Sequence, residues 1–165
     1  MVTRYAKIVM CLCLAAFAGL VAFDNWPADY GSNYEFVRHV LSMDTIFPGS
    51  KLADRAILDP LLWRIAYGLI IAAEYATAGF FLVGSFRLWR DRRGTAEQFQ
   101  RAKSCAIIAA TLAFVLWFFG FMVVGGEWFA MWQSPTWNGQ EGAFRFVIVI
   151  LGVLIFLHQR DESPQ

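Results

Sequence analysis

Residues 61–86 read LLWRIAYGLIIAAEYATAGFFLVGSF, an apolar run with a single acidic residue, Glu74, near its middle. A helix that crosses a bilayer needs about 20 predominantly apolar residues, so this run predicts a transmembrane helix. A carboxylate in hydrocarbon is costly. We therefore expect Glu74 to face the interior of a helix bundle or a wet cavity.

Three further apolar runs lie outward from this one, at about residues 8–23, 105–125 and 143–157. The first and last are short, and each extends by a turn if Lys7 and Arg145 snorkel to the surface. Since Arg4 and Lys7 precede the first run, a cleaved signal peptide is an alternative there. We expect a retained span, and a single domain over 1–165 with four spans at about 6–24, 60–87, 104–126 and 142–159.

The composition agrees with a membrane protein, because 58% of the residues are hydrophobic and only 16% are charged. Soluble domains average roughly 45–50% apolar and about 25% charged. The expected environment is thus the lipid bilayer, and a net charge of +1 gives no reason to expect a nucleic acid partner. Four helices joined by short turns predict an all-α membrane protein, a four-helix transmembrane antiparallel bundle.

The orientation follows from the lysines and arginines. Nine of them lie at the two ends of the chain and in the loop after the second span, and five lie on the other side. This split predicts cytoplasmic N- and C-termini and places residues 25–59 outside. Both histidines, His39 and His158, then fall on opposite sides, so one chain cannot supply two histidine ligands to one haem. The sequence offers no metal site, cofactor or catalytic motif.

The stretch 25–59 predicts short helices that cap the bundle. Ser32 can cap a helix over residues 32–43, with Glu35 at the capping-box position. The apolar residues of this helix share one side, which lets it lie flat on the bundle mouth or at the lipid interface: Phe36, Val37, Val40 and Leu41. A second short helix follows at 50–58. Pro60 then opens the second span.

Glu74 is the centre of a predicted intramembrane polar site. Tyr67 and Thr77 share its helix face, and Trp117, at similar depth on the third span, could donate its indole N–H. Three interpretations stay open: a protonated Glu74 that hydrogen-bonds a neighbouring helix, a proton or ion relay, and a contact with a polar headgroup or partner subunit.

Two further groups of residues suggest contacts at the outer ends of the spans. Asp24, Arg64, Glu127 and Arg145 lie one on each span and could form a charge-balanced ring, or each could snorkel separately. Trp128, Trp132 and Trp137 favour an aromatic belt at the membrane boundary. Together with Phe36 and Val40, they could instead form a partner-binding face.

The strings DNWPADYGSNYEFVRHVLSMDTIFPG (24–49), IIAAEYATAGFFLVG (70–84) and GGEWFAMWQSPTWNGQEGAFRF (125–146) resemble a bacterial family of small integral membrane proteins of unknown function. The resemblance covers nearly the whole chain. It implies a four-span protein of the bacterial inner membrane with a periplasmic cap. It implies no activity, ligand or catalytic residue.

Three functions remain after this reasoning. We expect a small non-enzymatic protein, either an accessory or assembly subunit bound to a membrane-protein partner or a self-associating scaffold. Small residues spaced mostly four apart on the second span would let a helix of another protein or of a second copy approach closely: Gly68, Ala72, Ala76 and Gly79. The alternative is a small oligomeric proton, ion or solute transporter that uses Glu74. A second alternative is a redox- or quinone-linked membrane subunit.

Overall fold

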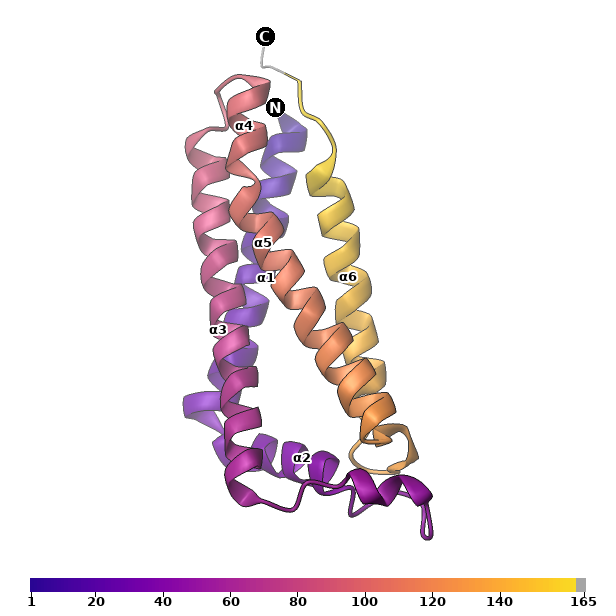
Figure 1. Cartoon of the computed structure of the whole chain (residues 1–165). Helices are drawn as coiled ribbons and strands as arrows, with labels where there is room; N and C mark the ends of the chain where they lie inside the picture. Colours follow the sequence, from indigo (N-terminus) through magenta and orange to yellow (C-terminus); the bar gives the residue numbers. More distant parts are fainter. Residues whose placement is uncertain (163–165) are drawn as a thin grey trace.

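The computed structural model describes residues 1–162. Over this range the chain is helical without a strand, and four helices are long and apolar enough to cross a membrane. They cover Val2–Ala28, Pro60–Arg90, Ala96–Trp128 and Gln140–His158. The predicted membrane bundle of four helices is thus confirmed. Figure 1 shows both termini at the same end of the bundle.

Each span is built from one to three helical elements. The first is α1 (Val2–Phe23) with the π-helical turn η1 (Asp24–Ala28), and the second is α3 (Pro60–Arg90). The third begins with the short helix α4 (Ala96–Ala102) and continues as α5 (Ser104–Phe114) and the π-helix η3 (Val115–Trp128), and the fourth is α6 (Gln140–His158). A 3₁₀ turn η4 (Met131–Gln133) lies between η3 and α6.

The second span starts where the sequence predicts. Pro60 occupies the first turn of α3, where its missing N–H costs nothing, and the Asp59 side chain accepts a hydrogen bond from the Leu61 N–H at 2.8 Å. Toward the end with the termini, α3 and α5 touch closely. A Cβ on Gly84 would lie 2.7 Å from the backbone nitrogen of Ala106, so only glycine fits at this crossing.

The helices of the cap lie across the opposite end of the bundle (Figure 1). They are α2 (Tyr30–Ser42) and the 3₁₀ turn η2 (Lys51–Arg55). The prediction of Ser32 as the N-cap of α2 is wrong, because the helix begins two residues earlier. Asp29 caps it by accepting a hydrogen bond from the Ser32 N–H.

The predicted apolar side of α2 faces the bundle. Val37 packs with Tyr67 and Ile71 of α3, and the ring of Phe36 stacks on that of Phe121 in η3 at 6.3 Å. The amphipathic pattern of the cap helix therefore joins the second span to the third.

Candidate functional site

The polar centre of the molecule forms where the first span breaks. The backbone leaves the helical conformation at Trp26 (φ −166°, ψ 126°), next to Pro27, which has no N–H to donate. A broken helix in a membrane leaves carbonyl groups that neighbouring helices must satisfy. The Tyr67 hydroxyl donates to the Asn25 carbonyl at 2.9 Å, and the Tyr75 hydroxyl donates to the Trp26 carbonyl at 2.6 Å. Two tyrosines of α3 thus stabilise the break.

Glu74 lies against the same break. Its residue is 2% exposed, and its two carboxyl oxygens accept hydrogen bonds from the side-chain amide of Asn25 at 3.0 and 2.7 Å. The Tyr67 hydroxyl also lies 3.3 Å from the Asn25 amide oxygen. Glu74 and Tyr67 of α3 are therefore linked through Asn25 of η1, which connects the first span to the second. The sequence places Asn25 in the cap, whereas the candidate span in the structure continues to Ala28.

The other residues predicted around Glu74 lie in different environments. Thr77 is fully buried one turn further along α3, and its hydroxyl has no hydrogen-bond partner among the described residues. Trp117 packs in an aromatic cluster, with its ring 6.0 Å from Phe17 and 5.7 Å from Phe146. The structure thus links Tyr67 to Glu74 through Asn25, and the donor to Glu74 is the amide of Asn25 rather than the predicted indole of Trp117.

The structure does not bring the predicted outer charge ring together. All four of its members are exposed, and no ion pair within residues 1–162 joins two of them: Asp24, Arg64, Glu127 and Arg145. Arg145 pairs instead with Glu141, one turn earlier on α6. A partner on the same helix is available without a fixed contact between spans, which is the physical reason for this local pairing.

The predicted interface aromatics divide into two kinds. Trp137 is packed inside the cap, stacked on His39 at 4.5 Å and edge-on to Phe36 at 6.1 Å. Trp128 and Trp132 are exposed by 55% and 47%. These last two are therefore the predicted interface aromatics with the most surface open to lipid or to a partner.

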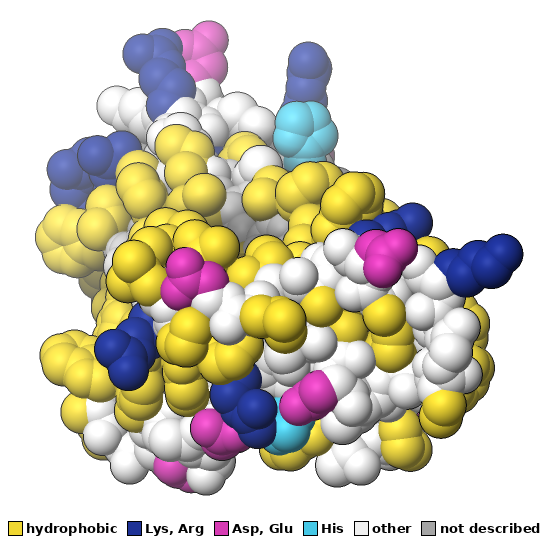
Figure 2. Space-filling view, turned by 60° about the horizontal axis from the view of Figure 1, so that its bottom comes forward, with side chains coloured by type: hydrophobic (Ala, Val, Ile, Leu, Met, Phe, Trp, Pro, Cys, Tyr) yellow, Lys and Arg dark blue, Asp and Glu magenta, His cyan; other side chains and the backbone are white. Residues whose placement is uncertain are grey.

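Over the described range, neither histidine lies in a metal site, and His39 of the cap is surrounded by ion-pairing side chains instead. His39 contacts Asp44 at 2.8 Å, and Arg38 pairs with Glu35 at 2.7 Å. Figure 2 shows acidic, basic and histidine side chains side by side on this end of the molecule. His158 ends α6 at the opposite end. Among the described residues, no group of three or more His, Cys, Asp or Glu could hold a metal ion.

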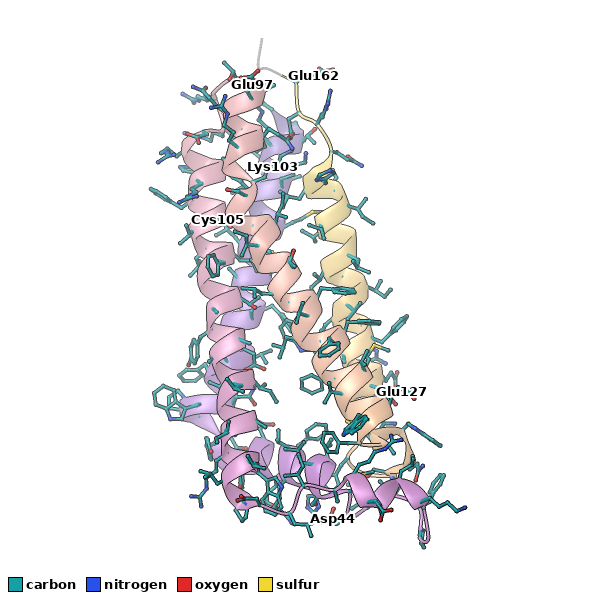
Figure 3. All side chains as sticks on the ribbon, in the orientation of Figure 1. Asp44, Glu97, Lys103, Cys105, Glu127 and Glu162 are labelled. Atoms are coloured by element: carbon teal, nitrogen blue, oxygen red, sulfur yellow. The ribbon has the colours of Figure 1, made fainter. Side chains whose placement is uncertain are left out.

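A second polar centre, which the sequence reasoning missed, lies at the end with the termini. Oδ2 of Asp161 is 2.8 Å from Nζ of Lys7 and 2.6 Å from Nζ of Lys103, and both lysine side chains are fully buried. Figure 3 places Lys103 at this end of the bundle. Both ammonium groups also donate to the Gln159 carbonyl at 2.7 Å. Burial acts to raise the pKa of Asp161, but the hydrogen bonds from Lys103 and Lys7 outweigh it, so its pKa is lowered.

Arg4 extends this second centre. Its guanidinium donates to the carbonyls of Arg92, Gly94 and Glu162, and it lies over the ring of Phe99 in α4. The start of α1, the loop after α3 and the chain after α6 are thereby tied together. The sequence feature that could have revealed this centre is Asp161, an acidic residue just beyond the last span on the side with most lysines and arginines.

A comparison with models of protein families finds a match over nearly the whole chain. The family described as predicted small integral membrane protein (DUF2165) matches residues 3–160. The comparison with curated proteins found no match, and neither did the comparison with solved structures.

Proposed function

The chain belongs to this family of predicted small integral membrane proteins, and from that premise we propose that it is a non-enzymatic accessory or assembly subunit, or a self-associating scaffold. The observation that supports this most is the hydrogen-bonded chain from Glu74 through Asn25 to Tyr67. Both of its carboxyl oxygens accept from Asn25, whose carbonyl accepts from Tyr67. A carboxyl group held in this way joins two helices, whereas an ion carrier must exchange its partners.

The outer surface of α3 supports association with another membrane protein. Gly68, Ala72 and Gly79 are exposed there, and a Cβ on either glycine would meet no atom within 4 Å. Small residues on a membrane-facing flank let a second helix approach closely. Ala76 is half-buried beside them. The exposed Trp128 and Trp132 add aromatic surface at the cap end.

Energy transfer between labelled copies in vesicles tests self-association through this face. We expect Gly68→Leu and Gly79→Leu to lower the transfer, because each adds bulk where the helices would touch. Gly152→Leu on α6 is the matched control, since Gly152 is also exposed with no atom within 4 Å of its Cβ position. The accessory form predicts instead a fixed partner at stoichiometric yield in a native-membrane pull-down. The proposal would be overturned if the wild type shows neither energy transfer between copies nor a partner at stoichiometric yield.

The location that we propose is the bacterial inner membrane with both termini in the cytoplasm. The nine lysines and arginines on the terminal side support this orientation. The shared end of the two termini agrees with it (Figure 1). Reporter fusions at the C-terminus and at Gly49 test it, and a cytoplasmic signal at Gly49 would contradict it.

One observation favours a second candidate, an oligomeric proton or cation carrier. The buried Thr77 hydroxyl lies one turn from Glu74 without a partner in the described part of the chain, so a water or ion would find a ligand there. Flux into protein-containing liposomes distinguishes the two functions. A flux of protons or cations through the wild type that Glu74→Gln abolishes would replace the accessory proposal with this one. No flux above protein-free liposomes is the result that the accessory proposal expects.

A further inference from the structure

A large apolar cavity lies between the second and third spans on the cap side. It has a volume of about 530 Å³, within the range of small-molecule sites, and every residue that lines it is apolar or glycine. Most of the wall comes from three elements, with Phe36 and Val40 from α2, Leu69 and Ala73 from α3, and Phe119 and Gly120 from η3. Leu112 of α5, Met131 of η4 and Phe129 complete it. The predicted interface residues of the cap helix thus turn inward and close this space.

The cavity opens sideways from the bundle. Leu69, Val115 and Phe119 line it and are nevertheless 66%, 50% and 56% exposed on the flank of the molecule. All three lie in candidate membrane spans, so the opening faces hydrocarbon. Along the bundle axis both ends are closed. Helix α2 crosses the cap end, and beyond Ala73 and Leu112 the helices α3 and α5 converge (Figure 1) toward their close contact at Gly84 and Ala106.

These walls decide what can occupy the cavity. Water needs polar partners, and the lining offers none, while an empty space would forfeit dispersion contacts. A spanning helix of a partner is about 10 Å wide and straight over many turns, so it would collide with α2 and with the α3–α5 crossing. A flexible hydrocarbon chain can enter from the flank and bend into the space.

We propose that this cavity binds one acyl chain of a bilayer phospholipid. The inference goes beyond the accessory role, because it assigns a ligand class to a site that the association surface on α3 does not use. The chain fills the gap that opens between α3 and η3 as they diverge toward the cap. It therefore packs against both spans and against the apolar side of α2.

Photo-crosslinking tests the site with a defined probe. The protein is reconstituted in vesicles of phosphatidylethanolamine and phosphatidylglycerol that contain phosphatidylglycerol with a diazirine on one acyl chain. After illumination, peptide mass spectrometry locates the adducts. We expect adducts on Ala73 and Gly120 inside the cavity, in addition to those on lipid-facing residues such as Ile148 of α6, which is exposed.

A matched pair of variants separates the cavity from the general lipid shell. Ala73→Phe fills the cavity, whereas Ala72→Phe adds the same bulk at a neighbouring exposed position that does not line it. We expect Ala73→Phe to lose the adducts on Gly120 while keeping those on Ile148, and Ala72→Phe to keep both. Gly120→Phe, from the opposite wall, should likewise lose the adducts on Ala73, and melting temperatures confirm that the variants fold.

Two results would overturn the inference. Equal labelling of Gly120 in the Ala73→Phe and Ala72→Phe proteins would show that the adducts come from the general lipid shell. Dimers of a Gly120→Cys variant in the same vesicles, linked through the cysteine at position 120 rather than through the exposed native Cys13, would show that a second copy of the chain occupies the opening.

Discussion

The two polar centres of this protein perform the same task with different chemistry. Both are buried, and both join segments far apart in the sequence. At the mid-span centre, the partners of Glu74 are an amide and, through it, a phenol. At the terminal centre, Asp161 meets two lysines at ion-pair distance. The depth of each centre relative to the lipid explains this difference.

Within the hydrocarbon an unpaired charge is costly, so the chain satisfies a broken helix with neutral donors. At the membrane border the terminal centre can hold three ions, because paired charges there repay part of their desolvation cost. The comparison predicts that the two centres respond differently to substitution and to pH.

The largest effect is expected at the terminal centre. Asp161→Asn leaves Lys7 and Lys103 buried without a counter-charge, which should lower the free energy of unfolding by about 3–5 kcal/mol. Glu162→Gln is the control, because it neutralises an exposed acid next to Asp161. The backbone carbonyl of residue 162, which accepts a hydrogen bond from Arg4, is unchanged. Denaturant unfolding in detergent measures both. Equal losses in the two variants would show that the ion pairs contribute nothing.

The same centre should make the fold sensitive to acid. The pKa of Asp161 is lowered in the folded state, so its contribution is complete above the unfolded pKa and is lost as the pH falls through the lower folded value. The loss therefore falls below about pH 4. Melting temperature measured against pH should show a step in this region for the wild type. The step should be absent in Asp161→Asn, and its persistence there would assign it to another group.

The mid-span tyrosines give a smaller, graded effect. Tyr67→Phe removes the donor to the Asn25 carbonyl in a fully packed place and should cost about 1–2 kcal/mol. Tyr75→Phe removes the donor to the Trp26 carbonyl at a site that is 39% exposed, and should cost less. Thermal unfolding of the two variants compares them. A larger loss for Tyr75→Phe would mean that burial does not set the cost.

The smallest effect is expected at the outer charges. Arg64 and Glu127 are exposed and unpaired with each other, so Arg64→Ala and Glu127→Ala should each change stability by less than about 0.5 kcal/mol. Their effects should also add in the double variant. If the double variant loses clearly less stability than the sum of the single losses, Arg64 and Glu127 interact, as the predicted charge ring requires.

The four spans and the cap helix were predictable because they depend on local patterns. Run length gives the spans, Asp59–Pro60 gives the start of α3, and the spacing of Phe36, Val37, Val40 and Leu41 gives the apolar side of α2. The contact of Glu74 with Asn25 was not predictable in the same way. It joins residues 49 positions apart and depends on the depth at which the first span breaks.

The terminal centre and the cavity were missed for related reasons. Lys7 carries the signal of a snorkelling residue, and only the course of the chain after α6 brings Asp161 to it. The cavity depends on the angle at which α5 and η3 leave α3. The sequence fixes its apolar lining but does not fix that angle.

A double-variant cycle on Asn25 and Glu74 tests most directly whether Glu74 fastens the first span to the second. Asn25→Leu leaves the carboxyl group of Glu74 without its donor, and Glu74→Leu leaves the amide without its acceptor, so each should cost about 1–3 kcal/mol. The double variant removes both polar groups. We predict that its loss of unfolding free energy is smaller than the sum of the two single losses by about 1 kcal/mol or more. Strictly additive losses in thermal unfolding would contradict this role of Glu74.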